Sequence, residues 1–175
     1  MIESADVLEA KKNRDNREYF LNKVKINPLL IEWANDEIRD DKEVILEAVK
    51  TGGGALEFAS SRLKSDKDVL LASTKNTGLT VCYTDKRLQS DRDVIKSAVS
   101  NDGQALYYAS KDLRDDKEIV KIAVSNKPII LKYASLRLRQ DKEIAEIALS
   151  KNKKCIEYLA EDLQKDPDIL KIIEA

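Results

Sequence analysis

Residue types that commonly carry enzyme chemistry are scarce in this 175-residue sequence. It has no histidine, which excludes Ser-His-Asp and Cys-His catalysis, HExxH zinc chemistry and a histidine-based pH switch. The glycine-rich stretch at residues 51–54 is not followed by Gly-Lys-Ser/Thr, and no strand pattern precedes it, so it does not match a phosphate-binding loop. We therefore predict no catalytic residues, no cofactor and no metal site, and a protein that is not an enzyme.

The charges nearly cancel. Lys and Arg number 31 and Asp and Glu number 32, which gives a net charge of -1. A general nucleic-acid or anionic-membrane binder would show a basic excess, so we expect no membrane partner and regard nucleic acid as a weaker alternative. The sequence shows neither a cleavable signal nor an apolar run long enough to cross a membrane. This pattern predicts a cytoplasmic protein, and delivery as a secreted effector stays open.

A tandem repeat sets the organisation of the chain. An aspartate recurs every 25 residues, and Asn16 stands one period before the first of them. The aspartates are Asp41, Asp66, Asp91, Asp116, Asp141 and Asp166. This spacing predicts one domain with a leader at 1–15 and a half-repeat at 166–175. The six full repeats between them are 16–40, 41–65, 66–90, 91–115, 116–140 and 141–165.

Each repeat carries the signals of two helices of about eight to ten residues. Apolar residues at i, i+1, i+4 and i+5 follow each aspartate, which predicts an amphipathic helix with the aspartate as its N-cap. This assigns the aspartates to capping rather than to metal binding. A Gly or Pro then ends that helix in every full repeat except 141–165, which has Lys153, and we expect the glycines to adopt positive φ. Short helices need lateral packing, so we predict an all-α fold: an α-solenoid (superhelix) of helix-break-helix repeats.

The repeat resembles a known family. Residues 91–114, DRDVIKSAVSNDGQALYYASKDLR, are similar to the units of domain of unknown function 4116, and the resemblance covers residues 16 to 175. Leucine-rich-variant repeats have a similar layout but use a 3₁₀ turn for one helix. The resemblance implies a component of bacterial or protist proteins, including those of intracellular bacteria that deliver effectors, and it implies no catalytic residues. Departures at Ser73-Thr74, Thr84-Asp85 and Lys153 predict looser packing there.

Two further columns have both a structural and a functional interpretation. An aromatic residue recurs two positions after an apolar one, as Trp33, Phe58, Tyr83, Tyr108, Tyr133 and Tyr158. It resembles a base-stacking platform, but its fixed register favours a place in the core. A basic residue follows each cap, as Arg17, Lys42, Lys67, Arg92, Lys117 and Lys142. Acids flank each one, so a solvated face is favoured over a grip on phosphates.

One face of the second predicted helix mixes apolar, aromatic and basic residues, with acidic residues at both ends of the array. These positions are predicted to point outward and to form a partner surface for an extended or helical, partly acidic segment. They are Leu79, Cys82, Lys86, Gln104, Tyr107, Lys111, Ile129, Lys132 and Leu136. The same register predicts an accessible thiol at Cys82 and a buried thiol at Cys155, too far apart for a disulfide.

These observations predict a non-enzymatic protein-interaction scaffold that presents a surface to a protein or peptide partner. Three alternatives stay open. One is a nucleic-acid binder, sequence-tolerant or with one repeat per base, and another is an accessory module of a translocated effector. The third is self-association through the half-repeat, which ends in the apolar-rich stretch LKIIEA.

Overall fold

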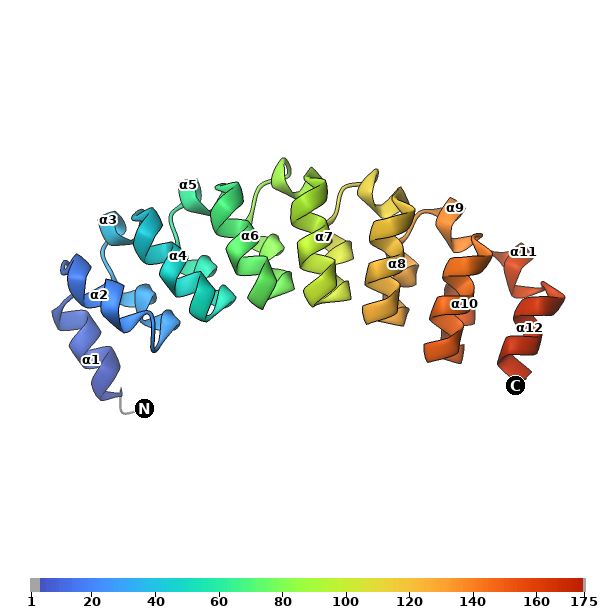
Figure 1. Cartoon of the computed structure of the whole chain (residues 1–175), viewed down its shortest axis with the longest axis horizontal. Coiled ribbons are helices and arrows are strands. Elements are labelled where there is room, and N and C mark those ends of the chain that lie inside the picture. Colours follow the sequence, from blue (N-terminus) through green and yellow to red (C-terminus); the bar gives the residue numbers. More distant parts are fainter. Residues whose placement is uncertain (1–3, 175) are drawn as a thin grey trace. The chain divides into compact units, whose positions relative to one another are not determined.

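The computed structural model describes residues 4–174, and all regular secondary structure in that part is helical (Figure 1). The chain divides into two compact units, Met1–Leu88 and Gln89–Ala175. No helix among the described residues is both long enough and apolar enough to span a membrane. The leader and half-repeat predictions extend to residues 1–3 and 175, which lie outside the described residues.

The first unit contains α1 (Ala5–Lys12), α2 (Arg17–Lys23), η1 (Pro28–Trp33), α3 (Asp36–Arg39), α4 (Lys42–Thr51), η2 (Gly53–Phe58), α5 (Ser61–Lys64), α6 (Lys67–Asn76) and η3 (Gly78–Tyr83). The 3₁₀ helix η4 (Leu88–Ser90) begins at the last residue of this unit. The second unit contains α7 (Arg92–Asn101), η5 (Gly103–Tyr108), η6 (Leu113–Asp115), α8 (Lys117–Asn126), η7 (Pro128–Tyr133), α9 (Leu136–Arg139), α10 (Lys142–Lys151), η8 (Lys153–Tyr158), α11 (Glu161–Gln164) and α12 (Pro167–Glu174).

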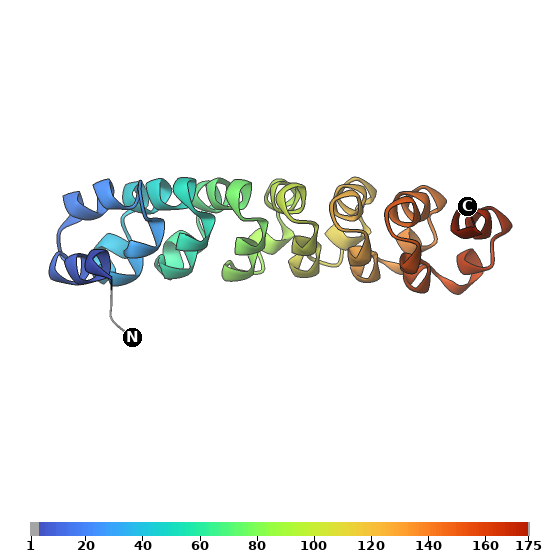
Figure 2. The same ribbon diagram turned by 90° about the horizontal axis from the view of Figure 1, so that it is seen from below.

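Within each unit the repeats pack side by side. The longer α-helices contact one another, α4 with α6 in the first unit and α8 with both α7 and α10 in the second, and the 3₁₀ helices form a second row beside them (Figure 2). The predicted caps are confirmed: each longer helix from α4 to α10 begins after an aspartate whose carboxylate accepts a backbone N–H from its first turn. Asp116, for example, accepts from the Ile119 N–H at 3.0 Å.

The prediction of a second α-helix in each repeat is wrong. A six-residue 3₁₀ helix stands there, and an extended residue such as Ala109 (ψ 150°) separates it from a single short turn. The extended residue frees the next N–H to bind the preceding repeat: the Ser110 N–H donates to the Gln89 carbonyl at 3.0 Å, and the Ser135 N–H donates to the Arg114 carbonyl at 2.9 Å. A continuous α-helix would use those N–H groups internally.

The aromatic column does not lie in the core, contrary to its favoured interpretation. Leu106 is fully buried in η5, whereas Tyr108 is half-buried, and Tyr133 occupies the same half-buried position in η7. A 3₁₀ helix has three residues per turn, so a residue two positions after a core leucine cannot share its face. Ala109, three positions after Leu106, is buried instead.

The glycines at the helix ends have a different role from the expected one. No described residue, glycine or otherwise, has a positive φ. A Cβ atom on Gly103 would instead lie 2.3 Å from the Ala123 carbonyl oxygen of the next repeat. Glycine is therefore needed at this position because the backbone of the following helix approaches closely.

Hydrogen bonds accommodate the departures from the repeat pattern, and burial is lower at two of the three places: Thr84 is half-buried where Ala109 is buried, and Lys153 is exposed where Gly103 is buried. Ser73 and Thr74 are fully buried, and the Ser73 Oγ lies 2.7 Å from the Thr80 Oγ1 and 3.0 Å from the Gly53 carbonyl oxygen. The Thr84 hydroxyl donates to the Lys64 carbonyl at 2.7 Å. At Lys153 the 3₁₀ helix begins without a glycine or proline, and the ammonium donates to the Ile173 carbonyl at 3.1 Å.

The two cysteines have the predicted environments: both are free, Cys82 is exposed and Cys155 is buried. Burial raises the pKa of both thiols, so neither is strongly activated. We expect a thiol reagent at neutral pH to modify Cys82 in the native protein and Cys155 only after unfolding. Mass spectrometry of peptides labelled with and without urea measures this difference, and equal labelling rates in the native protein would contradict the register of the 3₁₀ helices.

Candidate functional site

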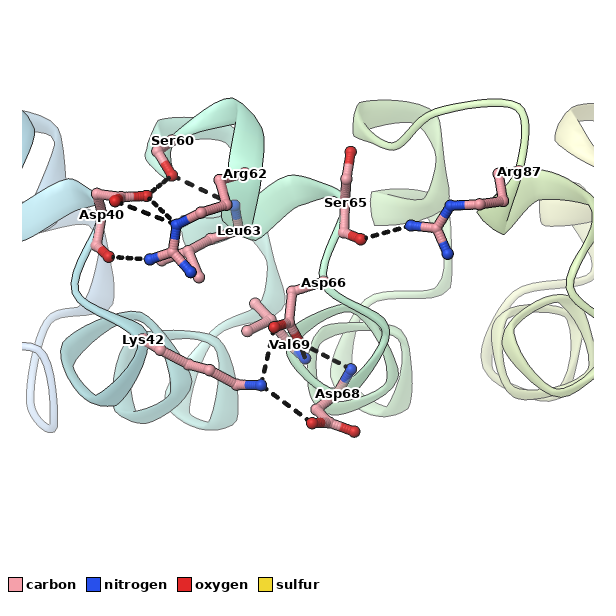
Figure 3. A network of polar contacts seen from close by, with 10 residues as sticks. All are labelled: Asp40, Lys42, Ser60, Arg62, Leu63, Ser65, Asp66, Asp68, Val69 and Arg87. Carbon is pink, nitrogen blue, oxygen red and sulfur yellow. Dashed lines mark hydrogen bonds and ion pairs between the residues drawn. The ribbon is translucent and has the colours of Figure 1, made fainter.

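The basic residue after each cap keeps an exposed or half-buried side chain, in line with the solvated face that we favoured, and it also joins neighbouring repeats. In the first unit, Lys42 Nζ lies 2.8 Å from Asp66 Oδ2 and 3.0 Å from Asp68 Oδ2 of the next repeat (Figure 3). The second unit repeats this arrangement with Arg92, Lys117 and Lys142, whose cations lie 2.7–3.0 Å from the next capping aspartate. These side chains are occupied by internal ion pairs, so this face offers little free charge to a ligand.

The cations of these ion pairs lower the pKa values of the carboxylates that they contact. Hydrogen bonds from Arg17 hold the pKa of Asp41 below its usual range despite partial burial. Bonds from Lys96 and Arg92 lower the pKa of Glu118 to about 2, and bonds from Lys121 and Lys117 do the same for Glu143. These carboxylates stay ionised at neutral pH, which suits a structural role and not general acid catalysis.

A second set of polar contacts joins the short turns. Asp40 accepts from the Ser60 hydroxyl and, at 3.0 Å, from Arg62 Nε (Figure 3). Both bonds lower the pKa of Asp40, and the bond from Ser60 has the larger effect. Asp115 makes the same contacts with Ser135 and Arg137 in the second unit. These groups are also satisfied within the fold.

The predicted partner surface is exposed at eight of its nine positions, and Leu79 is half-buried. Leu79, Cys82 and Lys86 belong to the first unit, and the other six positions belong to the second. In the second unit Tyr107 is 52% and Leu136 56% exposed, values that are unusual for such large apolar side chains. The structure brings Gln104, Tyr107, Ile129 and Lys132 together around one hollow.

This hollow, the tyrosine hollow, lies between η5 and η7 and has a volume of about 360 Å³. Its lining is Gln104, Tyr107, Tyr108, Lys127, Ile129, Ile130, Lys132 and Tyr133. The ring of Tyr107 meets Tyr108 and Tyr133 edge-to-face, with centroids 5.0 and 4.9 Å apart. Edge-to-face contacts of this kind stabilise the arrangement of the rings that line the hollow.

A second hollow, the arginine hollow, shares Tyr133 with the first and has a volume of about 310 Å³. Lys111, Arg114, Ala134 and Ser135 complete its lining. Neither hollow is lined by an acidic residue. An equivalent hollow in the first unit does contain acids, because Asp36 stands at the repeat position of Lys111 and Glu57 at that of Lys132.

The cations of the two hollows lack carboxylate partners among residues 4–174. Lys127 donates to the amide oxygen of Gln104, and Lys132 Nζ lies 5.0 Å from the centre of the Tyr133 ring. Lys111 forms no ion pair with a described residue, and the Nε of Arg114 is buried without a hydrogen-bond partner there. This arrangement can bind anionic and apolar groups.

Within the described chain, no three carboxylates or thiols come together to hold a metal ion.

Sequence reasoning missed Tyr108, Tyr133 and Arg114 as parts of this site. The aromatic residues recur in every repeat, but placing them in the core assumes that the second element is an α-helix, and it is a 3₁₀ helix. The spacing of three residues between Gln104 and Tyr107 matches one turn of a 3₁₀ helix, so it could have predicted that both residues lie on its outward face. Lys86 and Leu136 remain exposed but do not line either hollow.

Comparisons with known proteins agree with the repeat. The model of the family described as Domain of unknown function (DUF4116) matches residues 16–64, 41–89, 66–114, 91–139 and 116–164. Successive matches begin one 25-residue period apart, as the aspartate spacing does, and together cover residues 16–164. No curated protein and no solved structure gave a match. The chain therefore belongs to the DUF4116 family of helical repeats.

Proposed function

We propose that the protein is a non-enzymatic interaction scaffold, with its repeats arranged as an α-solenoid that presents a surface to a protein or peptide partner. The observation that supports this best is the pair of hollows in the second unit, where the exposed Tyr107 and two half-buried tyrosines lie beside cations with no carboxylate partner among residues 4–174. Tyrosine and arginine are enriched at the energetic centres of protein interfaces. Elsewhere in this unit, Arg92, Lys117 and Lys142 are neutralised internally, which makes the hollows chemically distinct.

The test is affinity capture from lysates of the source cell and of a host cell, with the wild type and the variant Tyr107→Glu/Lys111→Glu/Lys132→Glu. All three side chains are exposed, so both proteins should melt alike, and this is measured first. The matched control is Lys12→Glu/Lys25→Glu/Ile26→Glu, which places the same changes on exposed residues of the first unit.

We expect a partner that binds the wild type and the control and is lost with the triple variant. A partner held equally by all three proteins would contradict the assignment of the surface to the hollows. Capture of no protein in either lysate would contradict the scaffold function and favour self-association.

A further inference from the structure

Arg114 lines the arginine hollow, and its guanidinium forms no ion pair with a described residue. Its Nε is buried without a hydrogen-bond partner, as are those of Arg39 and Arg139 at the same repeat position, so Nε itself does not distinguish Arg114. The unpaired charge does, because a carboxylate is the acceptor that fits the guanidinium geometry.

The same position in another repeat shows an arginine whose charge is paired within the chain, although its Nε is also buried without a hydrogen-bond partner. Arg39 stands where Arg114 stands in the repeat, and it forms an ion pair with Asp36, three residues earlier. In the second unit the residue three positions before Arg114 is Lys111. The carboxylate has thus been replaced by a second cation, so the fold itself does not supply the partner of Arg114.

The tyrosine hollow next to it requires a different group. Three tyrosines, Ile129 and the buried Ile130 line it, and such a lining favours an apolar or aromatic side chain. The two hollows share Tyr133 as a common wall. Alternate side chains of an extended segment lie on one face about 6.6 Å apart, so such a segment places neighbouring side chains in both hollows.

We propose that the second unit binds an extended acidic peptide segment through these two hollows. One carboxylate of the segment pairs with Arg114 and Lys111, and an apolar or aromatic side chain two residues away fills the tyrosine hollow. This inference rests on the proposed scaffold function and names the chemical class of its partner.

Nucleic acid is the competing ligand, because a phosphate also pairs with Arg114. The aromatic rings favour the peptide. Lys132 Nζ lies 5.0 Å from the centre of the Tyr133 ring, and Tyr107 packs against that ring at an interplanar angle of 73°. Base stacking would have to displace these contacts, whereas a side chain enters the hollow beside them.

The test begins with selection of random heptapeptides displayed on phage, using the full chain. Enriched peptides are then synthesised with a fluorescent label and titrated by anisotropy. We expect enrichment of an aspartate or glutamate two residues from an apolar or aromatic residue. Replacing that acid with lysine in the peptide should abolish binding.

Two protein variants test the contact. Arg114→Gln should weaken binding about tenfold or more, because a charge-assisted hydrogen bond is lost. Lys111→Asp places a carboxylate where Asp36 stands relative to Arg39, so it should abolish binding without lowering the melting temperature. Lys25→Gln, on an exposed lysine of the first unit, is the matched control and should leave the affinity unchanged.

Three results would overturn the inference. Enriched peptides without carboxylates that still lose binding with Tyr107→Glu would overturn the acidic partner and leave the scaffold function intact. Undiminished binding to Lys111→Asp would show that the acidic side chain of the peptide does not bind at Arg114. A single-stranded oligonucleotide of twelve bases that binds more tightly than every peptide, and is lost with Lys111→Asp, would replace the peptide with nucleic acid.

Discussion

Gly103→Ala is expected to destabilise the second unit by about 1–3 kcal/mol, the range typical of overpacking against a rigid neighbour. The added Cβ would lie 2.3 Å from the Ala123 carbonyl oxygen and 3.1 Å from Lys127 Cβ. The nearest atom is backbone within α8, so it cannot rotate away as a side chain would. Relief of the contact requires the next repeat to shift.

Gly54→Ala is the matched control, because no heavy atom lies within 4 Å of a Cβ built there. Alanine restricts the unfolded chain more than glycine does, so this variant should be neutral or more stable by up to about 1 kcal/mol. Urea denaturation of both variants beside the wild type measures the difference. Equal midpoints for Gly103→Ala and Gly54→Ala would show that the close approach between repeats does not determine stability.

Asp116→Ala is expected to cost about 1–2 kcal/mol, because one side chain caps α8 and also joins two repeats. Its carboxylate accepts the Ile119 N–H at 3.0 Å, and Arg92 Nε lies 3.0 Å from its other oxygen. Asp116→Asn keeps an acceptor for the cap and removes the charge. An exposed ion pair contributes only about 0–1 kcal/mol, so the asparagine variant should lose much less stability.

Thermal melts at low and high salt separate these two contributions. Salt should reduce the difference between the wild type and Asp116→Asn, because the ion pair is screened. It should leave most of the difference between Asp116→Asn and Asp116→Ala, which is the cap. An asparagine variant as unstable as the alanine variant would assign the stability to the ion pair instead.

The first helix of each repeat could be predicted from the sequence because its determinants are local. A capping aspartate, an acid in the first turn and apolar residues at helical spacing all lie within ten residues, as from Asp91 to Ser100. The second element depends on a contact outside its own segment. The Ser110 N–H binds Gln89 of the preceding repeat, and this bond breaks the helix that the apolar pattern alone suggests.

The candidate site was predictable only in its exposure. Tyr107, Ile129 and Lys132 could be placed on the surface because they fall between core positions. Lys117 and Lys132, however, cannot be told apart from the sequence, because only the contacts between neighbouring repeats show which lysine is paired with a carboxylate. Lys117 Nζ lies 2.7 Å from Asp141, whereas Lys132 packs over a tyrosine ring.

The proposed scaffold function places its partners at the tyrosine hollow of the second unit. The most direct measurement replaces Tyr107 with the photo-crosslinking residue p-benzoylphenylalanine and illuminates the protein in a lysate of the source cell. The control carries the same residue in place of Ile26, which is 83% exposed in the first unit. We predict an adduct with another polypeptide from position 107 and none from position 26. No adduct from position 107, or the same adduct from both positions, would contradict binding of partners at the tyrosine hollow.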